Sequence, residues 1–132
     1  MVLMPQQVID MINRPNTNKV MATVSPDGLP HTIVCGSLMS TAPDTIIVGE
    51  AFMYRTVENL EKNRNAEFIV WSGRDAYSIK AVAQERKSEG PEYQRMTELL
   101  SKMNMSVTAI WIFKATEVWD ESASKNAGDR VV

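Results

Sequence analysis

The sequence has very little cysteine and histidine, and each scarcity excludes a class of site. Cys35 is the single cysteine among 132 residues, so no disulfide can form within the chain. His31 is the single histidine, which excludes a metal site built from several imidazoles. A lone free cysteine suits a reducing compartment, and we expect a cytoplasmic protein.

Features of membrane and nucleic-acid proteins are lacking as well. The first residues, MVLMPQQVID, have no basic start followed by an apolar run, unlike a secretory signal peptide. No apolar run approaches the roughly 20 residues that a membrane helix needs. The formal net charge is −2, whereas nucleic-acid binders usually carry a basic excess. We therefore expect neither a membrane nor a nucleic acid among the partners.

Common catalytic and phosphate-binding motifs are also absent. The sequence contains no GxGxxG, no GxxxxGK[ST] and no GxSxG segment. Cys35 lies within an apolar stretch, which indicates a buried, inert thiol, with the wall of a ligand pocket as the alternative. His31 follows Pro30 and is interpreted as a surface or capping histidine rather than a catalytic one.

A series of short strand patterns is present, in a chain of one-domain length. Apolar and β-branched runs between turn signals predict strands at about 19–24, 31–39, 45–50, 66–72, 76–86 and 106–119. Helices are predicted at 5–13, at 56–63, and from Gly90 onwards. Strands and helices do not alternate regularly, so we expect one domain over residues 1–132, mainly β, forming a closed or split barrel with few free edges.

Three local patterns refine this picture. Ser25-Pro26-Asp27-Gly28 predicts the turn of a first hairpin. The run from Ala109 to Phe113 is apolar on both faces, so one face can line the barrel while the other needs cover. That cover is either a helix or a second copy of the chain, and the run is therefore a hint of a dimer. Residues 120–132 form a polar tail whose composition is compatible with loose order.

The segment from Phe52 to Leu60 carries the strongest chemical signal. Thr56 is a plausible N-cap of the helix predicted at 56–63, and Arg55 stands at or just before its start. A cation there is unfavourable by about 0.3–1 kcal/mol because of the helix dipole, and a bound anion would reverse the sign. Arg55, the Thr56 hydroxyl and the free helix N–H groups thus predict a phosphate site. The alternative is an ordinary exposed arginine beside a capped helix.

Four segments occur in a characteristic order: VMATVSPDGLPHTIVCGSL, DTIIVGEAFMYRTVENLEKN, AEFIVW and YSIKAVAQ. Together they resemble the FMN-binding split-barrel superfamily, which includes pyridoxamine 5′-phosphate oxidases and small bacterial FMN-binding proteins. The resemblance covers about residues 15–119. It implies a six-stranded antiparallel split β-barrel of Greek-key type, forming a homodimer with FMN in the groove between the subunits.

Carried over by position, the resemblance also implies site residues. Arg55 and Thr56 are expected to bind the FMN phosphate, with Asn59 supporting that turn. Lys80 is expected to approach the cofactor from the partner subunit, and Trp119 to pack near the flavin ring. The wall beside the ring is expected from the second strand, at Ile33, Val34, Cys35, Gly36 and Ser37.

Two departures from the family pattern limit the functional expectation. Ala81 stands where members often carry glycine, and the tail has only Arg130 in place of an arginine-rich substrate segment. We therefore do not expect oxidation of pyridoxamine phosphate. The sequence predicts a flavoprotein acting as an oxidoreductase or electron carrier, with NAD(P)H or a protein as electron donor. The alternatives are a non-catalytic flavin store or sensor, the same fold with a deazaflavin or haem, and an interaction module without cofactor.

Overall fold

The computed structural model describes all 132 residues, which form three helices and seven strands. The helices are α1 (Gln6–Asn13), α2 (Tyr54–Lys62) and α3 (Pro91–Ser101). The strands are β1 (Asn18–Val24), β2 (Pro30–Val34), β3 (Leu38–Ala42), β4 (Thr45–Glu50), β5 (Asn65–Ser72), β6 (Asp75–Lys87) and β7 (Ala109–Asp120). None of the helices has the length and apolar character needed to cross a membrane.

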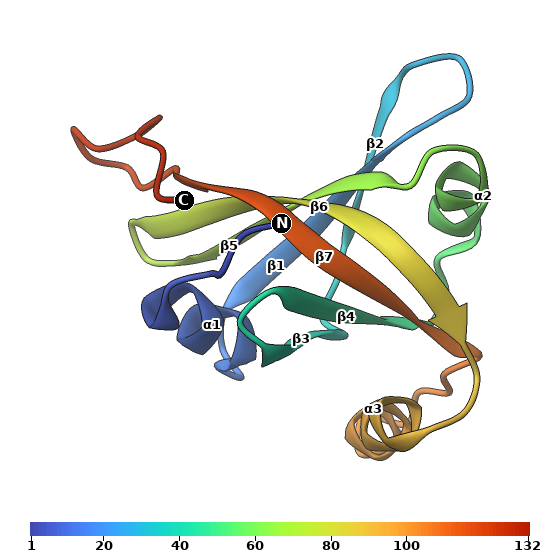
Figure 1. Cartoon of the computed structure of the whole chain (residues 1–132). Coiled ribbons are helices and arrows are strands. Elements are labelled where there is room, and N and C mark those ends of the chain that lie inside the picture. The colour runs from blue at the N-terminus through green and yellow to red at the C-terminus, as the bar shows by residue number, and fades with distance from the viewer.

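All seven strands belong to one antiparallel sheet, in the order β2-β1-β5-β6-β7-β4-β3. The long strands β6 and β7 run diagonally across the molecule, with α3 beyond their lower end and α2 beside the β1–β2 hairpin (Figure 1). The mainly β, split-barrel architecture expected from the sequence is thereby confirmed.

The expected strand count of six is wrong by one, because the segment predicted as a single strand at 31–39 is two strands. β2 pairs with β1, whereas β3 pairs with β4 at the opposite edge of the sheet. Three residues, Cys35 to Ser37, connect these two edges, so the sheet must coil back on itself. We call residues 35–37 the seam of the barrel.

The first hairpin forms at the predicted turn. The N–H of Gly28 donates to the carbonyl of Ser25, and the N–H of Ser25 donates to the carbonyl of Leu29, both at 2.9 Å. Gly28 has a φ of 84°, which favours glycine because a Cβ would be strained there. The turn sets the register in which Thr23 of β1 lies opposite His31 of β2.

The barrel interior holds the main core, a cluster of 21 buried residues. The rings of Phe68 on β5 and Phe113 on β7 meet edge to face, with centroids 5.2 Å apart. Helix α1 contacts β3 and β5 and buries Val8 and Ile12 completely. These two residues lie four positions apart and so share one face of the helix.

Strand β7 is apolar on both faces because it separates two clusters. Trp111 and Phe113 belong to the barrel interior, whereas Ile110 and Ile112 pack in a smaller cluster of seven buried residues that includes Met96 and Leu100 of α3. The second face is thus covered by a helix of the same chain. Strand β7 therefore no longer indicates a dimer, and a subunit interface would have to lie on another face of the molecule.

The C-terminal tail is tied to β7. The N–H of Val118 donates to the carbonyl of Val132 at 3.0 Å, and Arg130 forms an isolated antiparallel bridge with Trp119. The Arg130 guanidinium also lies over the Trp119 ring, 5.6 Å from its centroid. The polar composition of residues 120–132 is therefore misleading, because main-chain bonds and one stacked arginine order this segment.

Candidate functional site

The site begins where β4 passes into α2. The loop after Glu50 contains Phe52, which has a φ of 54°, a backbone region that non-glycine residues seldom adopt. Helix α2 then starts at Tyr54 and has no side-chain cap. Its first N–H groups have no acceptor within the helix, so they are available to a ligand.

Thr56 and Arg55 lie inside the helix rather than before it. The expected N-cap role of Thr56 is wrong, because the helix begins two residues earlier and Met53 occupies the cap position. Arg55 is exposed at the second helical position, while Thr56 is 1% exposed. A cation in the first helical turn faces the positive end of the dipole, so a bound anion would still be favourable there.

A cavity of about 180 Å³ lies beside this helix start, between α2 and β2. Two of its lining residues carry a buried polar atom without any hydrogen-bond partner: Oγ1 of Thr56 and Nε2 of His31. Buried polar atoms are almost always paired, so two orphans in one cavity indicate that a polar ligand belongs there. The lining residues are His31, Ile33, Phe52, Met53, Tyr54, Arg55 and Thr56.

Asn59 holds the helix in place rather than facing the cavity. Its Nδ2 donates to Oγ1 of Thr23 on β1 at 3.0 Å, and both residues are buried. This bond joins the middle of α2 to the strand that pairs with β2. A supporting role for Asn59 stays a prediction, and the bond gives it a physical basis.

The predicted wall, Ile33 to Ser37, follows the end of β2 and the seam. Ile33 lines the same cavity as Arg55, whereas Val34 points outward and is 85% exposed. Gly36 is exposed, and neither its N–H nor that of Ser37 donates to a backbone carbonyl. Two free N–H groups in succession could hydrogen-bond the polar edge of a planar ligand.

Within the wall, Cys35 and Ser37 are buried. The Ser37 hydroxyl donates to the carbonyl of Gly49 at 2.8 Å and so fixes the seam to β4. Burial raises the pKa of the Cys35 thiol to about 11, which keeps it protonated at neutral pH. Cys35 is thus part of the core, as the apolar context predicted.

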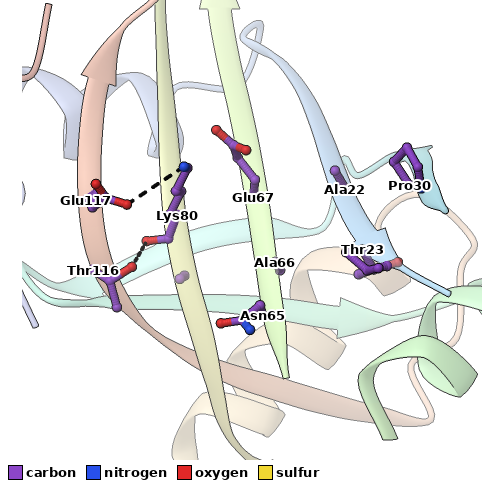
Figure 2. Close-up of a pocket in the computed structure, with 11 residues that line it drawn as sticks. Ala22, Thr23, Pro30, Asn65, Ala66, Glu67, Lys80, Thr116 and Glu117 are labelled. Carbon is purple, nitrogen blue, oxygen red and sulfur yellow. Dashed lines mark hydrogen bonds and ion pairs between the residues drawn. The ribbon is translucent and has the colours of Figure 1, made fainter. Parts of the chain in front are cut away.

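Lys80 and Trp119 lie apart from the cavity of Arg55. Lys80 is exposed on the outer face of the sheet and lines a hollow of about 340 Å³. Figure 2 shows it between Glu67 and Glu117. Its Nζ lies 3.8 Å from a carboxylate oxygen of Glu117. Trp119 points to the same outer face, and its buried Nε1 has no hydrogen-bond partner. One chain therefore does not bring these two residues to Arg55.

Sequence reasoning missed one residue of the cavity and one contact made at the end of β4. His31 was interpreted as a surface or capping residue, yet it is half-buried beside Thr56. The alternation of β2 could have found it, because His31 and the predicted wall residue Ile33 lie on the same face. Glu50 was also missed: its carboxylate binds Arg86 and Trp111, which are far away in sequence, and no local signal announces that contact.

The sequence model of the pyridoxamine 5′-phosphate oxidase family matches residues 4–131. The chain belongs to this family. A search of curated proteins finds no match.

Solved structures agree on the fold of this family member. An FMN-binding protein from Syntrophomonas wolfei subsp. wolfei superposes with a TM-score of 0.83 at 19% identity, covering 91% of this chain and 87% of the other. HupZ of Group A Streptococcus gives a TM-score of 0.78 at 24% identity, over 97% and 100%. An F420 reductase gives 0.65 at 14% identity, over 83% and 93%. Identities this low show a shared fold only.

Proposed function

We propose that the chain binds FMN, with the phosphate at the start of α2, and acts as an oxidoreductase or electron carrier. The observation that carries the proposal is the pair of orphaned atoms, Thr56 Oγ1 and His31 Nε2, beside the exposed guanidinium of Arg55. A phosphate offers acceptors to Arg55, to the Thr56 hydroxyl and to the free N–H groups of α2. Similarity in fold to an FMN-binding protein supports the same assignment.

The wall fits the remainder of the flavin. Ile33 offers apolar contact to the isoalloxazine ring, and the free N–H groups of Gly36 and Ser37 suit the carbonyl oxygens at its polar edge. Bound FMN would supply the hydride or electron transfer, while these residues bind and orient it.

We further propose that a homodimer completes the site, with Lys80 and Trp119 reaching the cofactor of the other subunit. The outer face of β1, β2 and β5 supports this, because Val34 is largely exposed and Val20 and Ile69 are partly so. Apolar side chains gathered on an exposed sheet face favour association. Light scattering at micromolar concentration should give the dimer mass. A monomer that still binds FMN tightly would contradict the partner's role.

The test of the phosphate site compares Arg55→Ala with Arg74→Ala, since Arg74 is an exposed arginine without an ion pair in the β5–β6 turn. Loss of one charge-assisted contact should weaken FMN binding in Arg55→Ala by about 2 kcal/mol, or roughly thirtyfold in Kd. Arg74→Ala should bind FMN as the wild type does. Equal affinities in a flavin fluorescence titration would remove Arg55 from the site.

Thr56→Val separates ligand binding from folding. The hydroxyl has no partner within the chain, so its removal should leave the free energy of unfolding unchanged or higher. The same variant should nevertheless bind FMN more weakly. A loss of stability without a loss of affinity would show that the hydroxyl serves the fold.

The visible spectrum of the purified protein and the mass of the cofactor released by heat test the proposal as a whole. Flavin bands with the mass of FMN support it, and the mass of a deazaflavin would replace FMN by an F420-type cofactor. Anaerobic bleaching by NAD(P)H would support an enzyme over a store or sensor. A colourless protein that does not bind added FMN would refute the assignment.

A further inference from the structure

A separate cavity of about 510 Å³ lies between α3 and the seam of the barrel. Its apolar wall includes Leu38 on β3 and two side chains at the end of α3, Leu99 and Met103. These two lie four residues apart and are 42% and 52% exposed. Exposed apolar side chains such as Leu99 and Met103, beside a cavity large enough for a small ligand, indicate a surface that binds an apolar group.

Positive charge surrounds this wall. Three cations, Lys19, Arg95 and Lys102, line the cavity against one carboxylate, that of Glu98. None of the three cations forms an ion pair within the chain. A cluster of unpaired cations beside apolar surface favours a ligand that carries a negative charge.

Lys19 is the most constrained of the three. Its ammonium group is partly buried and contacts only the carbonyl of Leu38, at 3.5 Å. Burial lowers the pKa of Lys19, because the charged form loses solvation. An anion in the cavity would offset this loss.

The neighbouring groove on the other side of α3 is larger, about 620 Å³, and shares Arg95 with the cavity at the seam, but its two lysines already form ion pairs. Lys87 pairs with Glu92 at 3.7 Å, and Lys114 pairs with Asp44 at 3.4 Å. The cavity at the seam therefore holds more unpaired positive charge than the groove, and we expect an anion to bind at the seam.

Gly36 connects this cavity with the predicted wall. It lines the cavity and belongs to the seam, and a Cβ built on it would meet nothing within 4 Å. The space beside the seam is thus open. A planar ring lying along Ile33 to Ser37 would end at this cavity.

We propose that the cavity binds an aromatic carboxylate beside the proposed flavin site. The carboxylate lies among Lys19, Arg95 and Lys102, and the aromatic body lies against Leu99 and Met103, where the Met103 sulfur adds a favourable contact with an aromatic ring. Binding of this anion is a property of the chain alone, whereas its place beside a flavin ring rests on the proposed flavin function.

Isothermal titration calorimetry of the purified protein with naphthoate tests the binding. Naphthalenemethanol is the control ligand, since it has the same body without the charge, and it should bind about tenfold more weakly or worse. Lys102→Glu should weaken naphthoate binding by about tenfold, whereas Lys125→Glu, the same charge change at an exposed lysine of the C-terminal segment, should alter it less than about twofold.

A second variant tests the apolar wall. Leu99→Gln keeps a helix-forming residue at an exposed position, so the fold should persist while naphthoate binding weakens about fivefold or more. Thermal unfolding of each variant checks that the fold is retained. Absence of naphthoate binding to the wild type, or equal effects of Lys102→Glu and Lys125→Glu, would overturn the proposal.

Visible spectra of the same samples separate this proposal from the flavin assignment. Naphthoate binding to a colourless protein that does not bind added FMN, with the expected variant effects, would support the anion site and refute the flavin. Flavin bands without naphthoate binding would do the reverse. Where both occur, naphthoate should shift the flavin bands, and unshifted bands would overturn its placement beside the ring.

Discussion

Glu50 stands at the end of β4, directly before the loop that leads to Arg55, and its replacement by glutamine is the most informative test of this region. The carboxylate accepts two hydrogen bonds from Arg86, both at 2.9 Å, and a third from Nε1 of Trp111 at 2.8 Å. The Glu50 side chain is 12% exposed. One carboxylate thus joins β4 to β6 and β7, directly before the loop that leads to α2.

The expected loss of stability follows from these contacts. A hydrogen bond to a charged group contributes about 1.5–3 kcal/mol when well shielded, but Arg86 is 41% exposed and solvent screens the pair. Glu50→Gln keeps one oxygen as acceptor and removes the charge. We expect the free energy of unfolding at neutral pH to fall by about 1–2 kcal/mol.

The same contact predicts a pH dependence. The bonds from Arg86, with the indole of Trp111, hold the pKa of Glu50 below its ordinary value. The unfolded chain therefore takes up this proton at a higher pH than the folded protein does. The contribution of Glu50 is present at neutral pH, above the unfolded pKa, and is lost as the pH falls through the folded pKa.

Urea unfolding from neutral pH down to about pH 3 measures both effects. The gap between wild type and Glu50→Gln should shrink toward acid, because the wild type then also carries a neutral group at this position. Glu89→Gln is the matched control, since Glu89 is exposed and forms no ion pair. A gap below about 0.5 kcal/mol at neutral pH, or a gap of constant size at every pH, would refute the reasoning.

Two further predictions concern the core. Gly49→Ala should destabilise the protein by about 1–3 kcal/mol in urea unfolding, because the new Cβ would lie 2.8 Å from Cγ of Met96 and 3.2 Å from Cδ1 of Leu100; an unchanged midpoint would mean that α3 can shift away from β4 at no cost. Cys35 should not react with a thiol reagent near pH 8 until urea unfolds the chain, because it is 3% exposed and its pKa is about 11; rapid labelling of the native protein would show that the seam opens.

Sequence alone was sufficient for most of the fold. The turn at Ser25–Gly28, the helices and most strand positions follow from turn residues and apolar periodicity, which are local properties. The resemblance carried by the DG turn and by the Arg55–Leu60 segment predicted the split barrel, which is confirmed. Local patterns could not reveal that residues 31–39 are two strands, because the break at the seam is imposed by pairing with β1 on one side and β4 on the other.

Part of the candidate site can be recognised from the sequence. Arg55 and Thr56 stand out in sequence because a cation at a helix start is unfavourable without an anion. The N-cap assignment of Thr56 was wrong because the helix begins two residues earlier. The loop before it contains Phe52 in the left-handed region, a conformation that its residue type does not predict. The orphaned atom of His31 also depends on burial, which a sequence does not specify.

The sequence by itself determined the β class, the order of all elements except the division of residues 31–39, and the segment that carries Arg55, because turn chemistry and periodicity act between near neighbours. The tertiary structure alone decided what covers the second face of β7, which residues share a cavity, and which polar atoms lack a partner. Those properties depend on contacts between residues far apart in the chain, such as Ile112 with the cluster of α3 and Glu50 with Arg86. Long-range packing, unlike local propensity, exists only once the sheet has closed.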